Sequence, residues 1–224
     1  MSNKLSAKAA VALILTVVIL VVSMCLGVLA TQGKVSSPVY ADADESYAKD
    51  ELVALYESGI IVGDADGGRI LLHPKSAVTR GEFVETLVRF FGISADRYTD
   101  EYITYPDYSK LSQNVKSALC ALSHYSLTDG VFPLTGDFSE GKSVLRLEAA
   151  LMLGKLIGGA GASFGFADAD SIPTAVFAQI AGLIDKKIVI GFPDGPLGLE
   201  KELTREQLAL ILTRFRNYTE QSKN

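Results

Sequence analysis

The side chains that most often perform catalysis in proteins are sparse in this chain, and none of them is arranged for it. His73 and His124 are the only histidines in 224 residues, and neither has a Cys, Asp or Glu at the spacing of a metal site or a catalytic triad. There is no Gly-x-Ser-x-Gly, no Walker loop and no dinucleotide fingerprint. Asp42 and Asp44 resemble a glycosidase pair only in residue type. The sequence therefore predicts a protein that is not an enzyme and needs no cofactor.

Cysteine and acidic side chains do not predict a metal site either. Cys25 and Cys120 are the only cysteines, and Cys25 lies within an apolar run, so the remainder of the chain has one thiol and no internal disulfide. The sequence Asp64-Ala65-Asp66-Gly67 resembles the start of a calcium loop. The residues that follow supply neither the third ligand nor the terminal Glu of an EF-hand. We therefore expect no metal.

The charge balance excludes several classes of partner. Residues 31–224 carry 19 Lys and Arg against 26 Asp and Glu, because Lys4 and Lys8 are the only charged residues before them. Nucleic-acid-binding proteins show basic patches, and anionic lipid surfaces attract clusters of Lys and Arg. We therefore expect no nucleic-acid partner and no membrane contact apart from the N-terminal segment. Capture of an anionic polymer would depend on a few placed cations.

Residues 1–30 have the pattern of an export segment. A short positive start is followed by an uncharged run of 22 residues, Ala9–Ala30, which is longer than a typical signal core and long enough to span a bilayer. Small residues allow cleavage after Ala30 or after Ala41, whereas the residues before Cys25 fit lipidation poorly. Cleavage after Ala30 and a retained anchor both stay open. In either case the rest of the chain is expected to be extracytoplasmic.

The remainder of the chain contains three similar segments, which we call the first (40–93), middle (98–158) and last (164–217) segments. They follow a linker at 31–39 and precede a polar tail at 218–224. Three landmarks recur in order in the first and last segments: 40–44 with 166–170, 59–63 with 187–191, and 79–82 with 204–207. Weaker versions in the middle segment lie at 105–107, 126–130 and 145–148. Such recurrence is the signature of a repeat architecture.

Each segment is predicted to be a helix, a loop and a second helix, which makes the fold all-α. Apolar residues recur at helical spacing, and Gly, Asp and Pro fill the loops between. Thr79 with Glu82, and Thr204 with Gln207, form capping boxes that start the second helices. Leu145 occupies the same position in the middle segment and lacks a capping hydroxyl.

Together these landmarks resemble the S-layer homology family. The closest matches are Gly191-Phe192-Pro193-Asp194-Gly195 and Thr79-Arg80-Gly81-Glu82, and the resemblance extends from Tyr40 to Asn217. It implies three modules packed about a pseudo-threefold axis, with grooves between them. It also implies attachment to the cell envelope through a secondary wall polysaccharide, typically a pyruvylated one. Cleavage after Ala41 would remove Tyr40, which opens the first segment, so we do not expect it.

The resemblance also implies which residues bind the polymer. The arginine of the Thr-Arg-Ala-Glu motif contributes to ligand binding in the family, and the matching residues are Arg80, Arg146 and Arg205. A guanidinium at a helix start, beside free N–H groups, suits a carboxylate. Aspartates at the segment openings could accept sugar hydroxyls, pair with these arginines or only cap turns; they are Asp42, Asp107 and Asp168. Three loop glycines would allow a ligand close to the backbone: Gly63, Gly130 and Gly191.

The middle segment departs most from the family pattern. Because Leu145 replaces the capping Thr and its loop lacks Pro-Asp-Gly, we expect the groove of Arg146 to be inactive and Arg80 and Arg205 to carry most of the affinity. The alternative function is a membrane-tethered structural or protein-interaction module that contacts peptidoglycan or another envelope protein. The expected location is the cell wall or S-layer, either free or anchored by the N-terminal segment.

Overall fold

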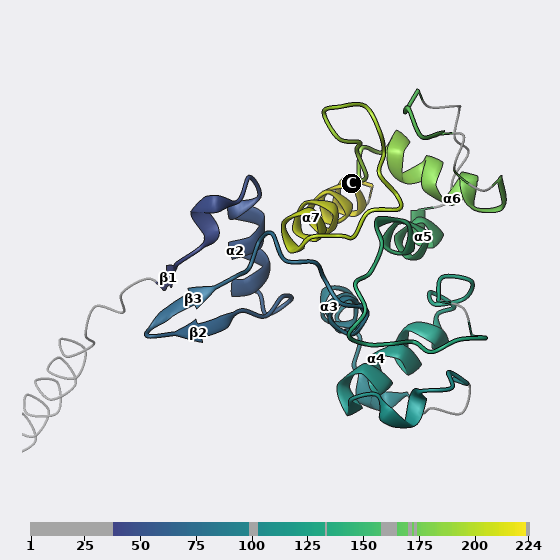
Figure 1. The fold of residues 1–224 in the computed structure, drawn as a ribbon, viewed down its shortest axis with the longest axis horizontal. Helices are drawn as coiled ribbons and strands as arrows, with labels where there is room; N and C mark the ends of the chain where they lie inside the picture. Colours follow the sequence, from purple (N-terminus) through teal and green to yellow (C-terminus); the bar gives the residue numbers. More distant parts are fainter. Residues whose placement is uncertain are drawn as a thin grey trace, which may run out of the picture. The chain divides into compact units, whose positions relative to one another are not determined.

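The helices predicted from apolar spacing are present in the computed structural model, which describes residues 38–98, 103–132, 134–157, 165–169, 172 and 174–222. The described part contains six α-helices: α2 (Lys49–Glu57), α3 (Arg80–Phe91), α4 (Gln113–His124), α5 (Arg146–Ile157), α6 (Thr174–Asp185) and α7 (Arg205–Gln221). Short 3-10 turns cover Ala43–Glu45, Ala95–Arg97 and Tyr108–Lys110. Residues Val39–Asn224 form one compact unit, and all that follows concerns this unit (Figure 1).

The predicted export segment at 1–30 lies outside the described residues, as does nearly all of the linker at 31–39. Within the described part, no helix is both long enough and apolar enough to cross a membrane.

The all-α prediction misses a small sheet in the first segment. Strands β1 (Val39–Tyr40), β2 (Asp64–Asp66) and β3 (Arg69–Leu71) lie in the order β1-β3-β2, with β1 parallel and β2 antiparallel to β3. Gly67 and Gly68 connect β2 to β3 with φ of 55° and 84°. Two consecutive residues with positive φ form the turn that matches the twist of a β-hairpin. The fold is therefore helix-rich with a short sheet. The Gly67-Gly68 turn, which the sequence analysis assigned to a loop, closes a hairpin between β2 and β3.

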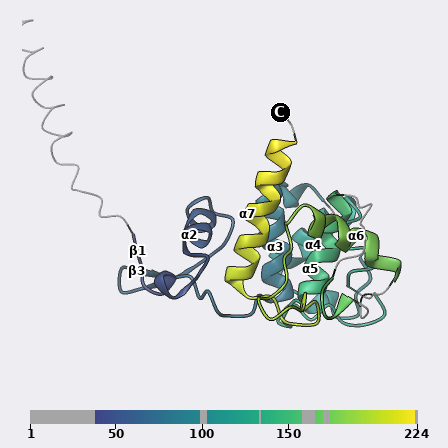
Figure 2. The same cartoon turned by 90° about the horizontal axis from the view of Figure 1, so that it is seen from above.

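Each first helix packs against the second helix of the preceding segment. The pairs are α4 on α3, α6 on α5 and α2 on α7, so the last helix of the chain closes the arrangement against the first. Figures 1 and 2 show α3, α5 and α7 side by side. Gly154 allows one of these contacts, since a Cβ at this position would lie 2.6 Å from the carbonyl oxygen of Gln179 on α6.

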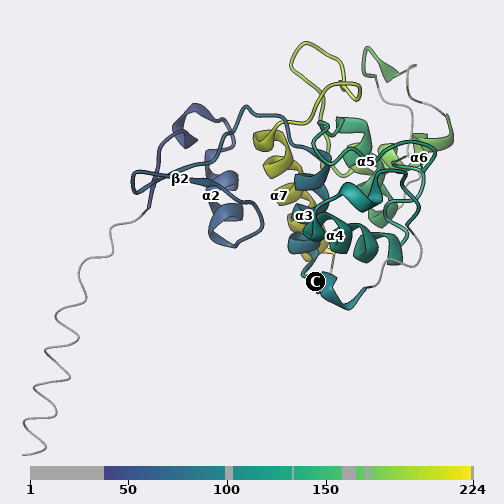
Figure 3. The same ribbon diagram turned by 60° about the horizontal axis from the view of Figure 1, so that its bottom comes forward.

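A closed ring of main-chain hydrogen bonds joins the three segments. Val78 N–H donates to the Leu203 carbonyl (2.8 Å), Leu203 N–H to the Val144 carbonyl (2.9 Å) and Val144 N–H to the Val78 carbonyl (2.9 Å). All three side chains are fully buried. Each residue lies two positions before the landmark arginine of its segment, so the ring fixes the starts of α3, α5 and α7 relative to one another (Figure 3).

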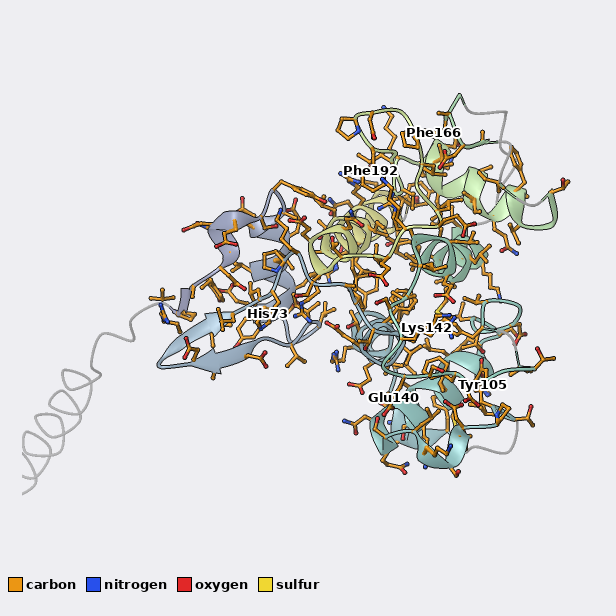
Figure 4. All side chains as sticks on the ribbon, viewed as in Figure 1. His73, Tyr105, Glu140, Lys142, Phe166 and Phe192 are labelled. Atoms are coloured by element: carbon orange, nitrogen blue, oxygen red, sulfur yellow. The ribbon has the colours of Figure 1, made fainter. Side chains whose placement is uncertain are left out.

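The N–H groups at these helix starts are occupied by neighbouring segments. The amide of Arg80 donates to Lys142 (2.7 Å) and that of Gly81 to Glu140 (2.9 Å); both acceptors lie beside α3 in Figure 4. Equivalent bonds join Arg146 to Lys201, Leu147 to Leu199, Arg205 to Ser76 and Glu206 to Pro74. The expectation of free N–H groups beside the arginines is therefore wrong: the tandem segments use these donors to bind one another.

The predicted helix caps are formed, with one informative difference. Thr204 and Gln207 make a complete capping box, whereas Thr79 accepts the bond from the Glu82 amide without the reciprocal bond. In the middle segment Leu145 cannot cap, yet its amide still donates to the Glu148 carboxylate at 2.8 Å. The side chain of the third residue of a second helix can therefore bond two groups: the main-chain N–H of its own N-cap residue, and the landmark arginine of another segment.

Candidate functional site

The three predicted aspartates hold the loops of their own segments. Each carboxylate accepts two consecutive main-chain N–H groups about thirty residues further on, at 2.7–2.9 Å. The acceptor and its donors are Asp42 with Leu72 and His73, Asp107 with Phe138 and Ser139, and Asp168 with Leu197 and Gly198. The second donor in each set has a positive φ, between 51° and 67°. These contacts favour the turn-capping role among the roles that the sequence left open.

The pKa of Asp168 reflects this arrangement. Desolvation by burial raises it, but the hydrogen bonds from the Leu197 and Gly198 amides outweigh that effect and hold the pKa below its usual value. The carboxylate is therefore retained in its ionised, bond-accepting form.

Two of the three predicted glycines are required by packing within their own segments. A Cβ on Gly63 would lie 2.8 Å from the Leu71 carbonyl oxygen, and one on Gly191 would lie 2.5 Å from the ring of Phe166. Gly130 meets nothing within 4 Å and instead has a φ of 69°. Of these, Gly191 also lines the cavity described below.

The three predicted arginines occupy equivalent positions and reach into the next segment. Arg80 donates to the Phe138 carbonyl (3.0 Å), Arg146 to the Leu197 carbonyl (3.2 Å) and Arg205 to the Leu72 carbonyl (2.7 Å). Each acceptor residue also donates its own amide to the aspartate of that segment. Aspartate, loop and arginine thus form one unit that is built three times, in cyclic order.

The partner on the neighbouring second helix distinguishes the three arginines. Arg80 forms an ion pair with Glu148, and the two side chains are 8% and 9% exposed. Arg205 forms an ion pair with Glu82. Arg146 meets Gln207 instead, with 3.3 Å between Nη1 and Oε1. Because an amide carries no net charge, Arg146 is the arginine of the three whose charge its helix partner does not neutralise.

Aromatic side chains fill the surroundings of Arg80. Its guanidinium lies 5.2 Å from the ring of Phe132, which packs edge-on against Phe138. The ring of Tyr105 also packs against Phe138, and burial raises the pKa of Tyr105 to about 12. With Glu148 already paired, this arginine has the surroundings of a structural ion pair.

Acidic groups surround Arg205. In addition to Glu82, its guanidinium donates to the Val62 carbonyl. Burial lowers the pKa of Arg205, while the nearby Asp64 and Asp42 carboxylates oppose that shift. His73, labelled in Figure 4, bonds Asp64 at 2.8 Å. An incoming anion would therefore meet repulsion at this position.

A cavity of about 440 Å³ opens beside Arg146. Its walls come from all three segments: Tyr47 of the first, Arg146 of the middle, and Phe192, Gln207 and Arg214 of the last. Arg146 also donates to the Ile190 carbonyl at 3.1 Å and lies 4.8 Å from the ring of Phe192. Figure 4 shows Phe192 in the lobe of the last segment.

Two arginines, Arg146 and Arg214, and one acidic residue, Glu206, line the cavity. Burial lowers the pKa of Arg146 and the charge of Arg214 acts in the same direction, while Tyr47 and the Asp168 carboxylate oppose the shift. A guanidinium remains protonated at neutral pH. The carboxylate of Glu206 is engaged elsewhere, by Lys75 Nζ at 3.0 Å and by the hydroxyl of Ser46 at 2.9 Å. Two guanidiniums therefore share this cavity without a free carboxylate.

Arg214 differs from its counterparts in the other segments. Arg89 donates to the Ile60 carbonyl at 2.8 Å, and Lys155 donates to the Ser126 carbonyl at 2.8 Å. Arg214 donates no hydrogen bond to any residue in the described ranges. It is positioned beside the cavity with its donors available.

Comparison with known families supports one part of the sequence prediction. Residues 39–84 match the S-layer homology domain. This match covers the segment that contains Asp42, Gly63 and Arg80. No curated protein matches the chain.

S-layer homology domains are non-catalytic modules that bind polysaccharides of the cell wall, and their presence places a chain at the cell envelope. The match ends before the middle and last segments, so of the residues that line the cavity beside Arg146 it covers Tyr47 alone.

Four residues that line the cavity were not among the binding residues predicted from the sequence: Tyr47, Phe192, Gln207 and Arg214. Gln207 and Arg214 could have been recognised, since both occupy positions that recur in every segment. At the position of Gln207 the other two segments have a glutamate, Glu82 and Glu148. Tyr47 could not have been recognised, because its contribution depends on the first segment meeting the last.

Proposed function

We propose that this chain is a non-catalytic cell-envelope attachment module that binds an anionic, pyruvylated secondary wall polysaccharide in the cavity beside Arg146. The observation that carries the proposal is the guanidinium of Arg146, which is 6% exposed and has no carboxylate partner within the described residues. A buried charge without a counter-charge is costly, and a ligand carboxylate would offset that cost.

The geometry of the cavity suits a compact acidic sugar substituent. Arg146 Nε, like Arg80 Nε, is buried and finds no acceptor among the described residues. The distinguishing feature of Arg146 is Nη1, which holds only the long bond to the neutral side chain of Gln207. Guanidinium groups bind carboxylates through pairs of N–H donors, and Arg214 supplies a second group of this kind. The ring of Phe192 and the side chain of Ile190 provide apolar surface for a ketal methyl group or a sugar face.

The three segments, 40–93, 98–158 and 164–217, are proposed to be three S-layer-homology-like repeats about a pseudo-threefold axis. The cyclic ring of Val78, Val144 and Leu203, and the three Asp–loop–Arg units, support this division. The contacts of the three arginines favour a different order of importance for ligand binding from the one predicted from the sequence. Arg146 becomes the leading ligand residue, while Arg80 and Arg205 have mainly structural partners.

The export segment is proposed to carry the body of the protein across the membrane, followed by cleavage after Ala30 or retention as an anchor. Either form would place residues 40–217 beside the wall polymer. Other envelope proteins are proposed as a second class of partner in this location.

Binding to isolated cell walls tests the function. The body of the protein should sediment with walls that carry pyruvylated polysaccharide, and binding should be lost when that polymer is chemically removed. Retained binding to the stripped peptidoglycan would support the alternative, a structural or protein-interaction module. Arg214→Gln should weaken sedimentation at least about tenfold, the loss of one charge-assisted pair. Arg216→Gln, two residues along the same helix and outside the cavity, is the matched control.

A further inference from the structure

We infer that the third residue of each second helix decides whether the adjacent arginine can accept an external anion, and that Gln207 is the specificity-determining residue of this chain. The inference rests on the proposed function, because it concerns the same cavity. It adds a statement about the three arginines of this chain: Glu148 and Glu82 occupy Arg80 and Arg205, whereas Gln207 leaves Arg146 open to an external carboxylate.

The molecule provides its own comparison. All three arginines begin a helix, donate to the equivalent loop carbonyl and face the third residue of the next second helix. Two of these third residues are glutamates, Glu148 and Glu82, and both are ion-paired with their arginine. Gln207 has the same shape and position but lacks the charge. The three positions are thus equivalent in the fold, and Gln207 differs from Glu148 and Glu82 in charge.

Gln207 already holds the location that a closing carboxylate would take. Its Oε1 is 3.3 Å from Arg146 Nη1 and 3.4 Å from the Thr204 amide. A glutamate there would accept both bonds with the same number of side-chain atoms, as Glu148 does with Arg80 and the Leu145 amide. It would add a negative charge within hydrogen-bond reach of Arg146, where a ligand carboxylate would otherwise bind.

The neighbouring residues make the cavity sensitive to that one charge. Arg214 is the second cation of the cavity, and Glu206 is already paired with Lys75. One added carboxylate therefore removes the excess charge of Arg146 and repels an anionic ligand. Coulomb repulsion between two carboxylates is strong where side chains exclude water.

The test is the substitution Gln207→Glu in the otherwise intact protein. The probe is a methyl hexopyranoside carrying a pyruvyl ketal, with binding measured by calorimetry and sedimentation on pyruvylated walls measured beside it. We expect at least about a tenfold loss of affinity, the equivalent of one pairing of about 1.4 kcal/mol. Gln221→Glu makes the same chemical change near the end of the same helix and should leave affinity within about twofold, because screening weakens a distant exposed charge.

Folding is checked on the same samples. Gln207→Glu keeps the capping group and supplies Arg146 with a partner, so its thermal midpoint should equal or exceed that of the parent. If the parent binds the ketal and Gln207→Glu, folded to the same extent, binds it equally well, the inference about Gln207 is wrong while the function stands. If the parent binds neither ketal nor walls, the proposed function itself fails.

Discussion

At the scale of single residues, the aspartates that open each segment explain how a loop of low regularity is held in place. Asp107 is 8% exposed and accepts the amides of Phe138 and Ser139 at 2.8 and 2.9 Å. Two main-chain donors would be left without partners in Asp107→Ala. We expect a loss of roughly 2–4 kcal/mol in the free energy of unfolding, because unsatisfied buried donors retain their desolvation cost.

Urea unfolding followed by circular dichroism measures this loss. Asp129→Ala is the matched control, since Asp129 is exposed and lies in the same segment. A change at Asp107 no larger than at Asp129 would contradict the bracing role.

The lowered pKa of Asp168 gives a dependence of stability on pH. A carboxyl group whose folded-state pKa lies below its unfolded-state value binds fewer protons in the folded state. Its contribution is therefore complete above the unfolded-state pKa of about 4 and declines as the pH falls through the lower folded-state pKa. The difference in thermal midpoint between the parent and Asp168→Asn should be constant near neutrality and shrink below about pH 4. A difference independent of pH down to acid unfolding would be inconsistent with this role.

At the scale of elements, close contact between α5 and α6 depends on Gly154. Helix propensity alone predicts that Gly154→Ala would stabilise α5 by roughly 1 kcal/mol. The added Cβ would lie 2.6 Å from the Gln179 carbonyl oxygen, so the helices would have to separate. We expect a net destabilisation of about 1–3 kcal/mol, as in other overpacked contacts. Chemical denaturation measures whether the free energy of unfolding of Gly154→Ala falls or rises. A rise would show that α5 and α6 can separate without cost.

The cap of α7 makes a second prediction about an element. Thr204 accepts the Gln207 amide and completes a capping box. Thr204→Ala should lower the free energy of unfolding by about 1 kcal/mol, the usual value of an N-cap. Thr219→Ala, in the last turn of the same helix, provides the control for removal of a hydroxyl. Equal effects of the two substitutions would argue against the cap.

Much of this element-level structure could be predicted from the sequence. Apolar spacing located α4, α6 and the second helices, and the threonines located the caps. The hairpin of β2 and β3 was missed, because Gly67-Gly68 specifies a turn locally while the pairing of its short flanking strands depends on packing. The neutral partner of Arg146 was also missed. Gln207 can be read in the sequence, but its contact with Arg146 follows from the cyclic order of the segments, which no local pattern specifies.

At the scale of the whole molecule, the ring of Val78, Val144 and Leu203 couples the three segments into one cooperative unit. Each amide is donated to a different segment, so none can open without breaking a contact between segments. Amides of this kind exchange through global unfolding. We expect the three amides to show similar hydrogen-exchange protection, close to the free energy of global unfolding. Fast exchange at one of them would show that its segment opens independently.

The cyclic arrangement also explains why one site can differ from two others built on the same plan. Each arginine meets the third helix residue of another segment, so a single substitution in the last segment alters a site that belongs to the middle one. In this chain Gln207 leaves Arg146 unpaired, while Glu148 and Glu82 pair with Arg80 and Arg205. We therefore propose that binding is concentrated in the cavity that residues of the middle and last segments line together with Tyr47 of the first.

The most direct test of this claim is a titration of the protein with the ketal-bearing hexopyranoside, followed through the arginine Nε–H resonances by NMR. The resonances of Arg146 and Arg214 should shift with a common dissociation constant, while those of Arg80 and Arg205 stay unchanged and the same sugar without its ketal has no effect. Shifts at Arg80 or Arg205 in place of Arg146 would contradict the assignment of the site to this cavity.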